Sequence, residues 1–210
     1  QMTAEAEFWS DMAERYALTP LSNPGAFERK IEVTKACMRP RDVVLDIGFG
    51  TGSLALRLAP NAATIHGLDI SSEMIRIAKG KAQAQGTENV RFHVGPFDSF
   101  ELFEPGSLDG VCAYSVLHLV EDLPATLERI HGLLRPGGFF VSSTVCLGDS
   151  WVPFRPILQV ARWFGKAPRV VSMLRKPALE DELRRAGFSG IEQPEVGAPS
   201  TIAFVVAKKA

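Results

Sequence analysis

Short apolar runs alternate with amphipathic stretches along most of this chain. Apolar, β-prone runs predict strands at 43–47, 64–70, 108–116 and 139–145, and the alternation of apolar and polar residues at 90–94 predicts another. Between them, apolar residues recur at helical spacing, which predicts helices at 54–58, 71–85 and 123–134. Strands that alternate with helices in this way indicate a parallel sheet covered by helices on both faces.

The two ends of the chain follow other patterns. Two helical segments, at about 5–16 and 24–38, precede the first strand. A helix at 177–186 precedes the last two strands, which are expected at 191–196 and 201–207. Only Gly197-Ala198-Pro199-Ser200 separates these strands, which is too short for a parallel crossover, so an antiparallel hairpin is expected.

The composition is that of an ordinary globular protein. Of the 210 residues, 46% are apolar and 22% are charged, and the net charge of −1 does not favour binding to nucleic acid or to an anionic membrane. The three cysteines are far apart and lack metal-ligand spacing, which favours a reduced protein without a metal site. No apolar run resembles a signal peptide or a membrane span, so a cytoplasmic protein is expected.

A glycine-rich stretch, Asp46-Ile47-Gly48-Phe49-Gly50-Thr51-Gly52, lies where the first strand turns into a helix. Glycines there let the backbone turn tightly and come close to a ligand. At the end of the second strand, Asp69 is placed where a carboxylate can accept both ribose hydroxyls of an adenosine. Loop and acid together indicate an adenosine-containing ligand. The alternatives are a plain tight turn and, for Asp69, a cap of the next helix.

The glycine spacing narrows the choice of ligand. The pattern is G-x-G-x-G, whereas the last glycine of a dinucleotide-binding G-x-G-x-x-G loop would fall at Ser53. The sequence also has no Tyr-x-x-x-Lys pair of a reductase and no Walker-type Gly-Lys-Ser/Thr. A nucleoside with a short tail is therefore favoured over a ligand that contains a pyrophosphate.

Four stretches resemble, in the same order, the motifs of the class I S-adenosylmethionine-dependent methyltransferases, and among them the ubiquinone/menaquinone-biosynthesis-like group. They are 44–52 (VLDIGFGTG), 67–74 (GLDISSEM), 108–118 and 133–138 (LLRPGG). The resemblance runs from about Phe8 to Ala207. It implies a Rossmann-like α/β fold, with a seven-stranded, mostly parallel sheet, an antiparallel C-terminal hairpin strand and helices on both faces.

This resemblance implies one methyltransferase domain over residues 2–210. The first part, 2–40, is expected to form an N-terminal helical cap, and 147–176 a lid-like insertion. The residues expected to bind S-adenosylmethionine are Tyr16, Asp46, Gly48, Gly50, Thr51, Gly52, Asp69, Ile70, Met74, Phe97, Asp98 and Tyr114.

Within this set the resemblance assigns different parts of the cofactor to different residues. The glycine loop would approach the methionine part, Asp69 the ribose, and Ile70 and Met74 the adenine. Tyr114 would lie near the sulfonium. Tyr16 would either close over the methionine carboxylate or serve as a core aromatic of its helix.

One stretch departs from the family pattern. After the third strand the family usually has Gly-Asp-Ala, but here the run is Gly95-Pro96-Phe97-Asp98. Proline has neither a carboxylate nor a backbone N–H to offer to adenine. Either Asp98 takes over this role from two positions later, or adenine is held by packing on Phe97 and by backbone groups.

Methyl transfer from a sulfonium needs positioning more than side-chain chemistry, and a base only where the acceptor must lose a proton. His118, after the fourth strand, is the candidate base, and a structural histidine that caps the next turn is the alternative. His66, His93 and His131 lie in or beside elements away from the ligand edge and are expected to be structural.

The insertion is the part of the chain from which the acceptor can be inferred. It is rich in aromatic residues, and its six basic residues between Ser150 and Leu179 have no acidic residue among them. Trp151 and Phe154 are therefore expected to form a wall for an apolar acceptor, with basic residues facing a phosphate or a bilayer. A helical lid with solvated charges is the alternative.

The function expected from these observations is S-adenosylmethionine-dependent methylation of a small, apolar acceptor, with no nucleic-acid partner and with peripheral membrane or lipid contact through 151–176. The alternatives are a non-catalytic S-adenosylmethionine-binding protein and a nicotinamide-dependent oxidoreductase.

Overall fold

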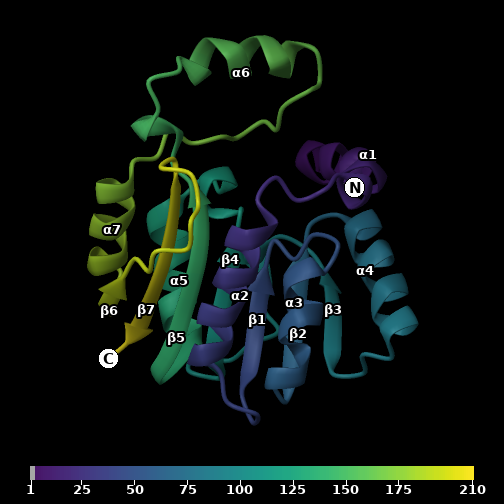
Figure 1. The fold of residues 1–210 in the computed structure, drawn as a ribbon, viewed down its shortest axis with the longest axis vertical. Coiled ribbons are helices and arrows are strands. Elements are labelled where there is room, and N and C mark those ends of the chain that lie inside the picture. Colours follow the sequence, from purple (N-terminus) through teal and green to yellow (C-terminus); the bar gives the residue numbers. More distant parts are fainter. Residues whose placement is uncertain (1–2) are drawn as a thin grey trace.

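Seven strands form one sheet in the order β3-β2-β1-β4-β5-β7-β6 in the computed structural model, which describes residues 3–210 (Figure 1). The strands are β1 (Val43–Ile47), β2 (Thr64–Asp69), β3 (Val90–Val94), β4 (Leu108–Tyr114), β5 (Leu134–Val145), β6 (Phe188–Glu192) and β7 (Ile202–Lys209). Neighbours among β1 to β5 are parallel, whereas β7 runs antiparallel to both β5 and β6. The predicted mostly parallel sheet with an antiparallel C-terminal hairpin is confirmed.

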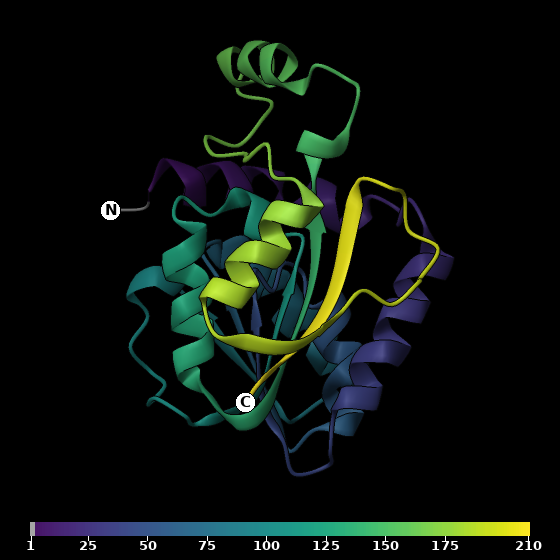
Figure 2. The ribbon, with the colours of Figure 1, turned by 90° about the vertical axis from the view of Figure 1, so that its left-hand side faces the viewer.

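Helices cover both faces of this sheet (Figures 1 and 2). They are α1 (Ala4–Leu18), α2 (Pro24–Cys37), α3 (Ser53–Leu58), α4 (Ser72–Gln85), α5 (Leu123–Leu133), α6 (Phe154–Trp163) and α7 (Lys176–Arg185). In the part of the chain that the structure describes, none of these helices is long and apolar enough to cross a membrane.

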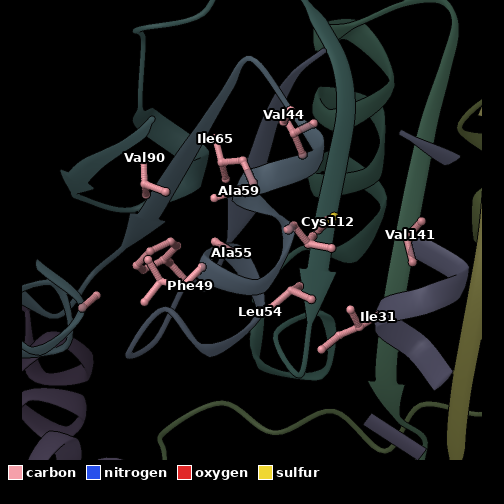
Figure 3. Close-up of a cluster of buried hydrophobic side chains, with 14 of the residues drawn as sticks. Ile31, Val44, Phe49, Leu54, Ala55, Ala59, Ile65, Val90, Cys112 and Val141 are labelled. Carbon is pink, nitrogen blue, oxygen red and sulfur yellow. The ribbon is translucent and has the colours of Figure 1, made fainter. Parts of the chain in front are cut away.

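Alternation along the strands divides the core into two layers. On β1, Val44 belongs to the cluster shared with α2, α3 and α4, part of which Figure 3 shows. Its neighbour Leu45 points to the opposite face and belongs to the cluster that includes α5 and α7. Both side chains are fully buried. Because successive strand residues point to opposite faces, a run apolar at every position is what a sheet covered on both sides requires.

Local signals in the sequence set where the helices begin and end. The Asn23 side chain accepts from Ala26 N at the start of α2, and Pro24 follows as the first helical residue. The Ser71 hydroxyl accepts from Met74 N at the start of α4, and Gly86 ends that helix in the left-handed conformation. These caps explain why the predicted helix boundaries are close to those observed.

The prediction for the last hairpin was wrong in detail. β6 spans Phe188–Glu192 and not 191–196, so residues 193–201 all belong to the connection. Phe188 is buried, and its ring centroid lies 5.3 Å from that of Phe140, so packing fixes the start of the strand. The pairing with β7 is interrupted by a register shift between Ser189 and Glu192. Likewise β5 begins at Leu134, earlier than expected, because Leu134 already pairs with Leu108.

The segment 147–176 leaves the carboxyl end of β5 and returns to the start of α7. In both views of the ribbon, α6 stands apart from the sheet and its covering helices (Figures 1 and 2). No residue of α6 is buried. The base of the segment is attached more firmly, since Gly148 N donates to Leu174 O and Asp149 accepts from Lys176 N.

Candidate active site

The glycine turn occupies the carboxyl end of β1, beside β2 and β4. Gly48, Gly50 and Gly52 have φ values of +65°, +55° and +79°, a region that side chains disfavour. A Cβ on Gly48 would lie 2.8 Å from Val116, in the chain that follows β4. Gly48 is thus needed for packing of two loops, whereas a Cβ on Gly50 would meet only Tyr16, at 3.8 Å. The turn lies where the helices that follow β1 and β4 diverge to opposite faces, the place where open α/β sheets bind ligands.

Asp69 ends β2 and is tied to this turn. Its Oδ2 accepts from Gly50 N at 2.8 Å, and its Oδ1 accepts from Ser71 N at 2.9 Å. The helix cap is Ser71, so Asp69 is not the cap of α4. Burial raises the pKa of the Asp69 carboxyl, against the lowering effect of the N–H groups of Ser71 and Gly50. A carboxylate has about four lone-pair sites, so two remain for further donors.

A second carboxyl, Asp46, lies beside Asp69. It is buried at the end of β1, between Gly67 of β2 and Cys112 of β4. Burial, and then the charge of Asp69, holds the pKa of Asp46 well above its ordinary range. Two neighbouring acids in a buried place favour protons or hydrogen-bond donors, which suits a ligand that brings hydroxyl or ammonium groups.

Tyr16 of α1 lies over the glycine turn. Its Cε1 is 3.8 Å from the position that a Cβ on Gly50 would occupy. Partial burial, and then the charge of Asp69, raises the pKa of the Tyr16 hydroxyl. The residue is half-exposed, so it is not a core aromatic, and the structure favours the other expectation, a ring that covers the loop.

Thr51 and Met74 flank the turn from within the fold. Both are buried, and the Thr51 hydroxyl accepts from Lys81 Nζ at 2.9 Å. Ile70 is half-buried between Asp69 and α4. The structure therefore gathers the predicted residues around one edge of the sheet, but it engages the Thr51 hydroxyl with α4.

The two candidates for replacing the missing acid after β3 differ in surroundings. The Phe97 ring packs against the core layer of α5, and the Arg129 guanidinium lies 5.3 Å from its centroid. Asp98 is exposed, and its Oδ1 accepts from the Ser99 hydroxyl at 3.1 Å. Phe97 is thus held in place by neighbours, whereas Asp98 is free to turn toward a ligand.

Tyr114 is at the carboxyl end of β4, as expected, but its hydroxyl is engaged elsewhere. It lies 2.7 Å from Thr34 Oγ1 and 3.1 Å from Lys30 O, both on α2. Burial is the main cause that raises the pKa of this hydroxyl. Any approach of Tyr114 to a ligand would be by its ring, because the hydroxyl fastens α2 to the sheet.

His118 lies in a short 3₁₀ turn after β4, Leu117–Leu119. Its Nδ1 is buried and has no hydrogen-bond partner among residues 3–210, and burial lowers its pKa to about 4. Of the alternative expectation, a structural histidine that caps the next turn, the cap is wrong because Asp122 caps α5, and a structural role stays a prediction. A neutral imidazole with an unused nitrogen can accept or donate one hydrogen bond to a ligand.

The other three histidines are engaged within the fold, as expected. His66 Nδ1 lies 2.9 Å from His93 Nε2, and the two rings stack. The His131 ring packs edge-on against Phe188.

Sequence reasoning missed Ser115, the residue between Tyr114 and Val116. Among the described residues it is the one non-glycine with a positive φ, +56°. Its N–H donates to Ser143 O at 2.7 Å, and its side chain is exposed at the site. Strain of this kind is common at functional sites, but a serine gives no signal of it in the sequence.

The expected aromatic wall is not formed. Trp151 is 95% exposed, and Phe154 lies on a helix without buried residues. The prediction that they line the acceptor site was wrong for this structure, because α6 stands away from the sheet. The return segment comes closer, since Ser172 N donates to His118 O and Arg169 N donates to a carboxylate oxygen of Glu5 on α1.

Comparisons with known proteins agree with this geometry. The sequence profile described as "methyltransferase domain" matches residues 39–181. The chain is 32% identical over 157 residues to the uncharacterized methyltransferase YcgJ of Bacillus subtilis, covering 75% of this chain and 59% of that protein. It is 30% identical over 144 residues to a demethylmenaquinone methyltransferase of Symbiobacterium thermophilum, covering 64% of this chain and 56% of that protein. The chain thus spans little more than half the length of these relatives.

Two solved structures share the fold. The crystal structure of the Bacillus subtilis YcgJ protein superposes with a TM-score of 0.72 at 17% identity, over 87% of this chain and 98% of that chain. A phosphoethanolamine N-methyltransferase of Haemonchus contortus, in complex with phosphomonomethylethanolamine and S-adenosylhomocysteine, superposes with a TM-score of 0.78 at 18% identity. That match covers 99% of this chain and 60% of the other. With the profile match over most of its length, the chain belongs to the methyltransferase-domain family of the class I S-adenosylmethionine-dependent methyltransferases.

Proposed function

We propose that this chain binds S-adenosylmethionine and transfers its methyl group to a small, apolar acceptor. The observation that carries the proposal is the buried Asp69 carboxylate, held by Gly50 N and Ser71 N beside a turn of three left-handed glycines. Family membership supports the same ligand.

The site leaves space for part of this cofactor and offers carboxylate acceptors to its hydroxyl and ammonium groups. Gly50 leaves the space between the loop backbone and the Tyr16 ring free of a side chain, and that cradle would take the methionine part. The two remaining lone pairs of Asp69 would take the ribose hydroxyls, and Ile70 and Met74 would flank adenine. The buried Asp46 favours an ammonium or hydroxyl group close by.

The bound cofactor supplies an electrophilic methyl carbon and its own leaving group. The chain's task is therefore to orient the acceptor and to exclude water. The His118 Nδ1 is buried without a partner among the described residues, so opening of the 117–119 turn would be needed for it to accept a hydrogen bond from an acceptor hydroxyl. With a pKa of about 4 this histidine is a weak base, so we assign it a positioning role and not a full deprotonation.

The acceptor is proposed to be small and apolar, and nucleic acid is not a proposed partner. The relatives named for menaquinone or ubiquinone biosynthesis support an apolar acceptor, whereas the phosphoethanolamine methyltransferase shows that the fold also takes a charged one. We also propose a cytoplasmic location, which the three free cysteines support because thiols persist in a reducing compartment.

Thermal denaturation tests the cofactor. At about 100 times the dissociation constant, S-adenosylhomocysteine should stabilise the protein by roughly 2.7 kcal/mol, because it binds only the native state. For a chain of this size the midpoint should rise by roughly 5–10 °C. NAD at the same concentration should shift it much less. A larger shift with NAD would favour the oxidoreductase and contradict the proposal.

Turnover separates an enzyme from a binding protein. Release of S-adenosylhomocysteine should be measurable with a panel of quinols, phenols, fatty acids and phosphoethanolamine. Cofactor binding without turnover on any of these acceptors would favour the non-catalytic alternative. Turnover on phosphoethanolamine alone would contradict the apolar acceptor.

A further inference from the structure

The amphipathic helix α6 presents part of its apolar surface to solvent. Ile157, Val160 and Phe164, spaced so that they share one side of the helix and its last turn, are 51%, 55% and 70% exposed. Trp163 beside them is 88% exposed, and Trp151, just before the helix, is 95% exposed. Monomeric soluble proteins rarely expose so many large apolar side chains together, and such a patch marks an interaction surface.

The half-buried residues of the same helix are Phe154, Leu158, Ala161 and Arg162, and of these Leu158 and Arg162 face the segment that returns to the sheet. Arg162 Nε donates to Pro168 O at 2.9 Å, which ties the helix to the segment that returns to the sheet. A cavity of about 320 Å³ lies between the two, lined by Arg155, Gln159 and Arg162 on the helix side and by Val171 and Met173 on the other. With these residues turned toward the protein, Ile157, Val160 and Phe164 are left facing solvent.

The positive charge around α6 indicates which kind of partner its exposed apolar residues would bind. No acidic residue occurs between Asp149 and Glu180, whereas Arg155, Lys166 and Arg169 are all exposed in this stretch. The helix is about 10–12 Å across, which is comparable to the Debye length of about 10 Å at 0.1 M salt. The electrostatic field of these basic residues therefore reaches a partner that contacts the apolar side of the helix. An apolar face with tryptophans and surrounding cations matches the interface of a bilayer with anionic headgroups.

A second copy of this chain fits less well. A two-fold contact would place the same surface of both molecules face to face. The basic residues of one α6 would then meet those of the other, without an acidic residue in the stretch to balance them. Repulsion of this kind disfavours self-association and favours an anionic surface.

We propose that α6 and its flanking residues, 151–169, form a docking surface for an anionic lipid bilayer. The helix lies in the plane of the interface with Ile157, Val160 and Phe164 among the acyl chains. Trp151 and Trp163 lie at headgroup level, and Lys166 and Arg169 face the lipid phosphates. Docking of this kind does not depend on the chemistry of the active site, so it can be measured whether or not the proposed methyl transfer takes place.

Vesicle co-sedimentation of the full chain tests the proposal. The protein should bind vesicles of phosphatidylcholine with about one-third phosphatidylglycerol and should bind pure phosphatidylcholine much less, because part of the attraction is electrostatic. Binding should fall as salt rises from about 50 mM to about 500 mM. In a Trp9→Phe background, emission of the two remaining tryptophans should shift to shorter wavelength on binding, since both are exposed in the free protein.

Matched variants identify the surface. The double variant Trp163→Ser/Phe164→Ser should lose vesicle binding by about tenfold or more. Lys166→Gln/Arg169→Gln should lose most of the salt dependence. Leu18→Ser, which removes an 82% exposed leucine from α1, is the control and should bind as the parent protein does. All three variants should keep the thermal midpoint, because every side chain that they replace is exposed.

Three results would overturn the proposal. The first is equal binding to neutral and anionic vesicles, and the second is undiminished binding by the Trp163/Phe164 variant. The third is a dimer in sedimentation velocity without lipid that the same variant abolishes, which would assign the apolar face to a second copy of the chain.

Discussion

Asp69 shows how one side chain can serve structure and ligand together. Its two oxygens join the glycine turn to the start of α4 through Gly50 N and Ser71 N. The sequence offered a ribose ligand or a helix cap as its role, and the structure assigns the cap to Ser71. Because the Asp69 carboxylate is bonded to both the loop and the start of the helix, it is held in one orientation. Its remaining lone pairs therefore point in fixed directions.

Replacing Asp69 should therefore affect binding and stability separately. Asp69→Ala should weaken S-adenosylhomocysteine binding by roughly 1.5–3 kcal/mol, the range for hydrogen bonds to a charged group. Isothermal titration calorimetry measures this change, and urea denaturation measures the loss of the two backbone contacts. The fold should survive. If stability falls and the dissociation constant stays that of the parent protein, the carboxylate is only a structural link.

Two glycines give a matched pair for testing the loop. Gly50→Ala should destabilise the fold by roughly 1–2 kcal/mol, because the Cβ of alanine disfavours a left-handed conformation. Gly80 lies inside α4, and a Cβ there would have nothing within 4 Å, so Gly80→Ala should stabilise by roughly 0.5–1 kcal/mol. Chemical denaturation of both variants checks the opposite signs. Equal effects would mean that Gly50 is not constrained by its φ of +55°.

At the level of elements, polar contacts fasten α2 over the carboxyl end of the sheet. Tyr114 Oη lies 2.7 Å from Thr34 Oγ1, and Lys30 Nζ donates to the Ser143 hydroxyl at 2.9 Å. These partners are 80 and 113 residues apart in the chain. No periodicity reports contacts of this range, which is why the sequence placed Tyr114 correctly on its strand but gave no indication of its partner.

A double-mutant cycle measures this contact. Tyr114→Phe and Thr34→Val should each lower the free energy of unfolding by about 1 kcal/mol, with a coupling energy of about 0.5–1.5 kcal/mol. The affinity for S-adenosylhomocysteine should stay within about twofold for Tyr114→Phe, since the hydroxyl is engaged with α2. A loss of affinity without a loss of stability would instead support the predicted contact of this residue with the cofactor.

The sequence predicted the existence of the strands more accurately than their first and last residues. β1 and β3 have the predicted bounds, because β1 is a short apolar run and β3 alternates apolar with polar residues, and turn residues bound both. β6 was misplaced because its start depends on Phe188 packing against Phe140, a contact across the sheet. Both β3 and β6 are edge strands, but the alternation of β3 can be recognised from its own residues, whereas the start of β6 depends on a contact between residues far apart in the chain.

For the molecule as a whole, the histidines make stability depend on pH. Burial, and then the charge of His93, lowers the pKa of His66 to about 4, below its ordinary 6.5. Between these values the unfolded chain binds a proton at this position and the folded chain does not. Stability is therefore lost as the pH falls from about 6.5 to about 4. Asp46 and Asp69 act in the opposite sense, because their pKa values are raised in the fold.

Comparison with a variant isolates the contribution of His66. His66→Gln removes one titrating group, so its free energy of unfolding should fall less steeply than that of the parent protein between about pH 6.5 and about 4. Above about pH 7 the two curves should run parallel. Urea midpoints at several pH values check this. Parallel curves over the whole range would mean that His66 titrates normally in the fold.

The sequence by itself determined the α/β class, most strand positions, the glycine turn, Asp69 and the family. These depend on local rules, namely apolar periodicity, caps and glycines where backbone must turn, and such rules can be read from a few neighbouring residues. Four of the expected site residues, Tyr16, Gly50, Asp69 and Asp46, are brought to one edge because parallel strands end there together.

Only the tertiary structure decided which side chains are free to meet a ligand and which way the insertion faces. The sequence identified α6 as aromatic and basic but placed Trp151 against an acceptor, whereas that side chain is almost fully exposed. It also left His118 as a cap or a base, and the structure leaves its Nδ1 buried and unpaired among the described residues. The amphipathic pattern in the sequence shows that the helix has an apolar side and a polar side. Which side meets the protein depends on contacts outside the helix, here of Arg162 with Pro168 just beyond it and of Ser172 with the distant His118.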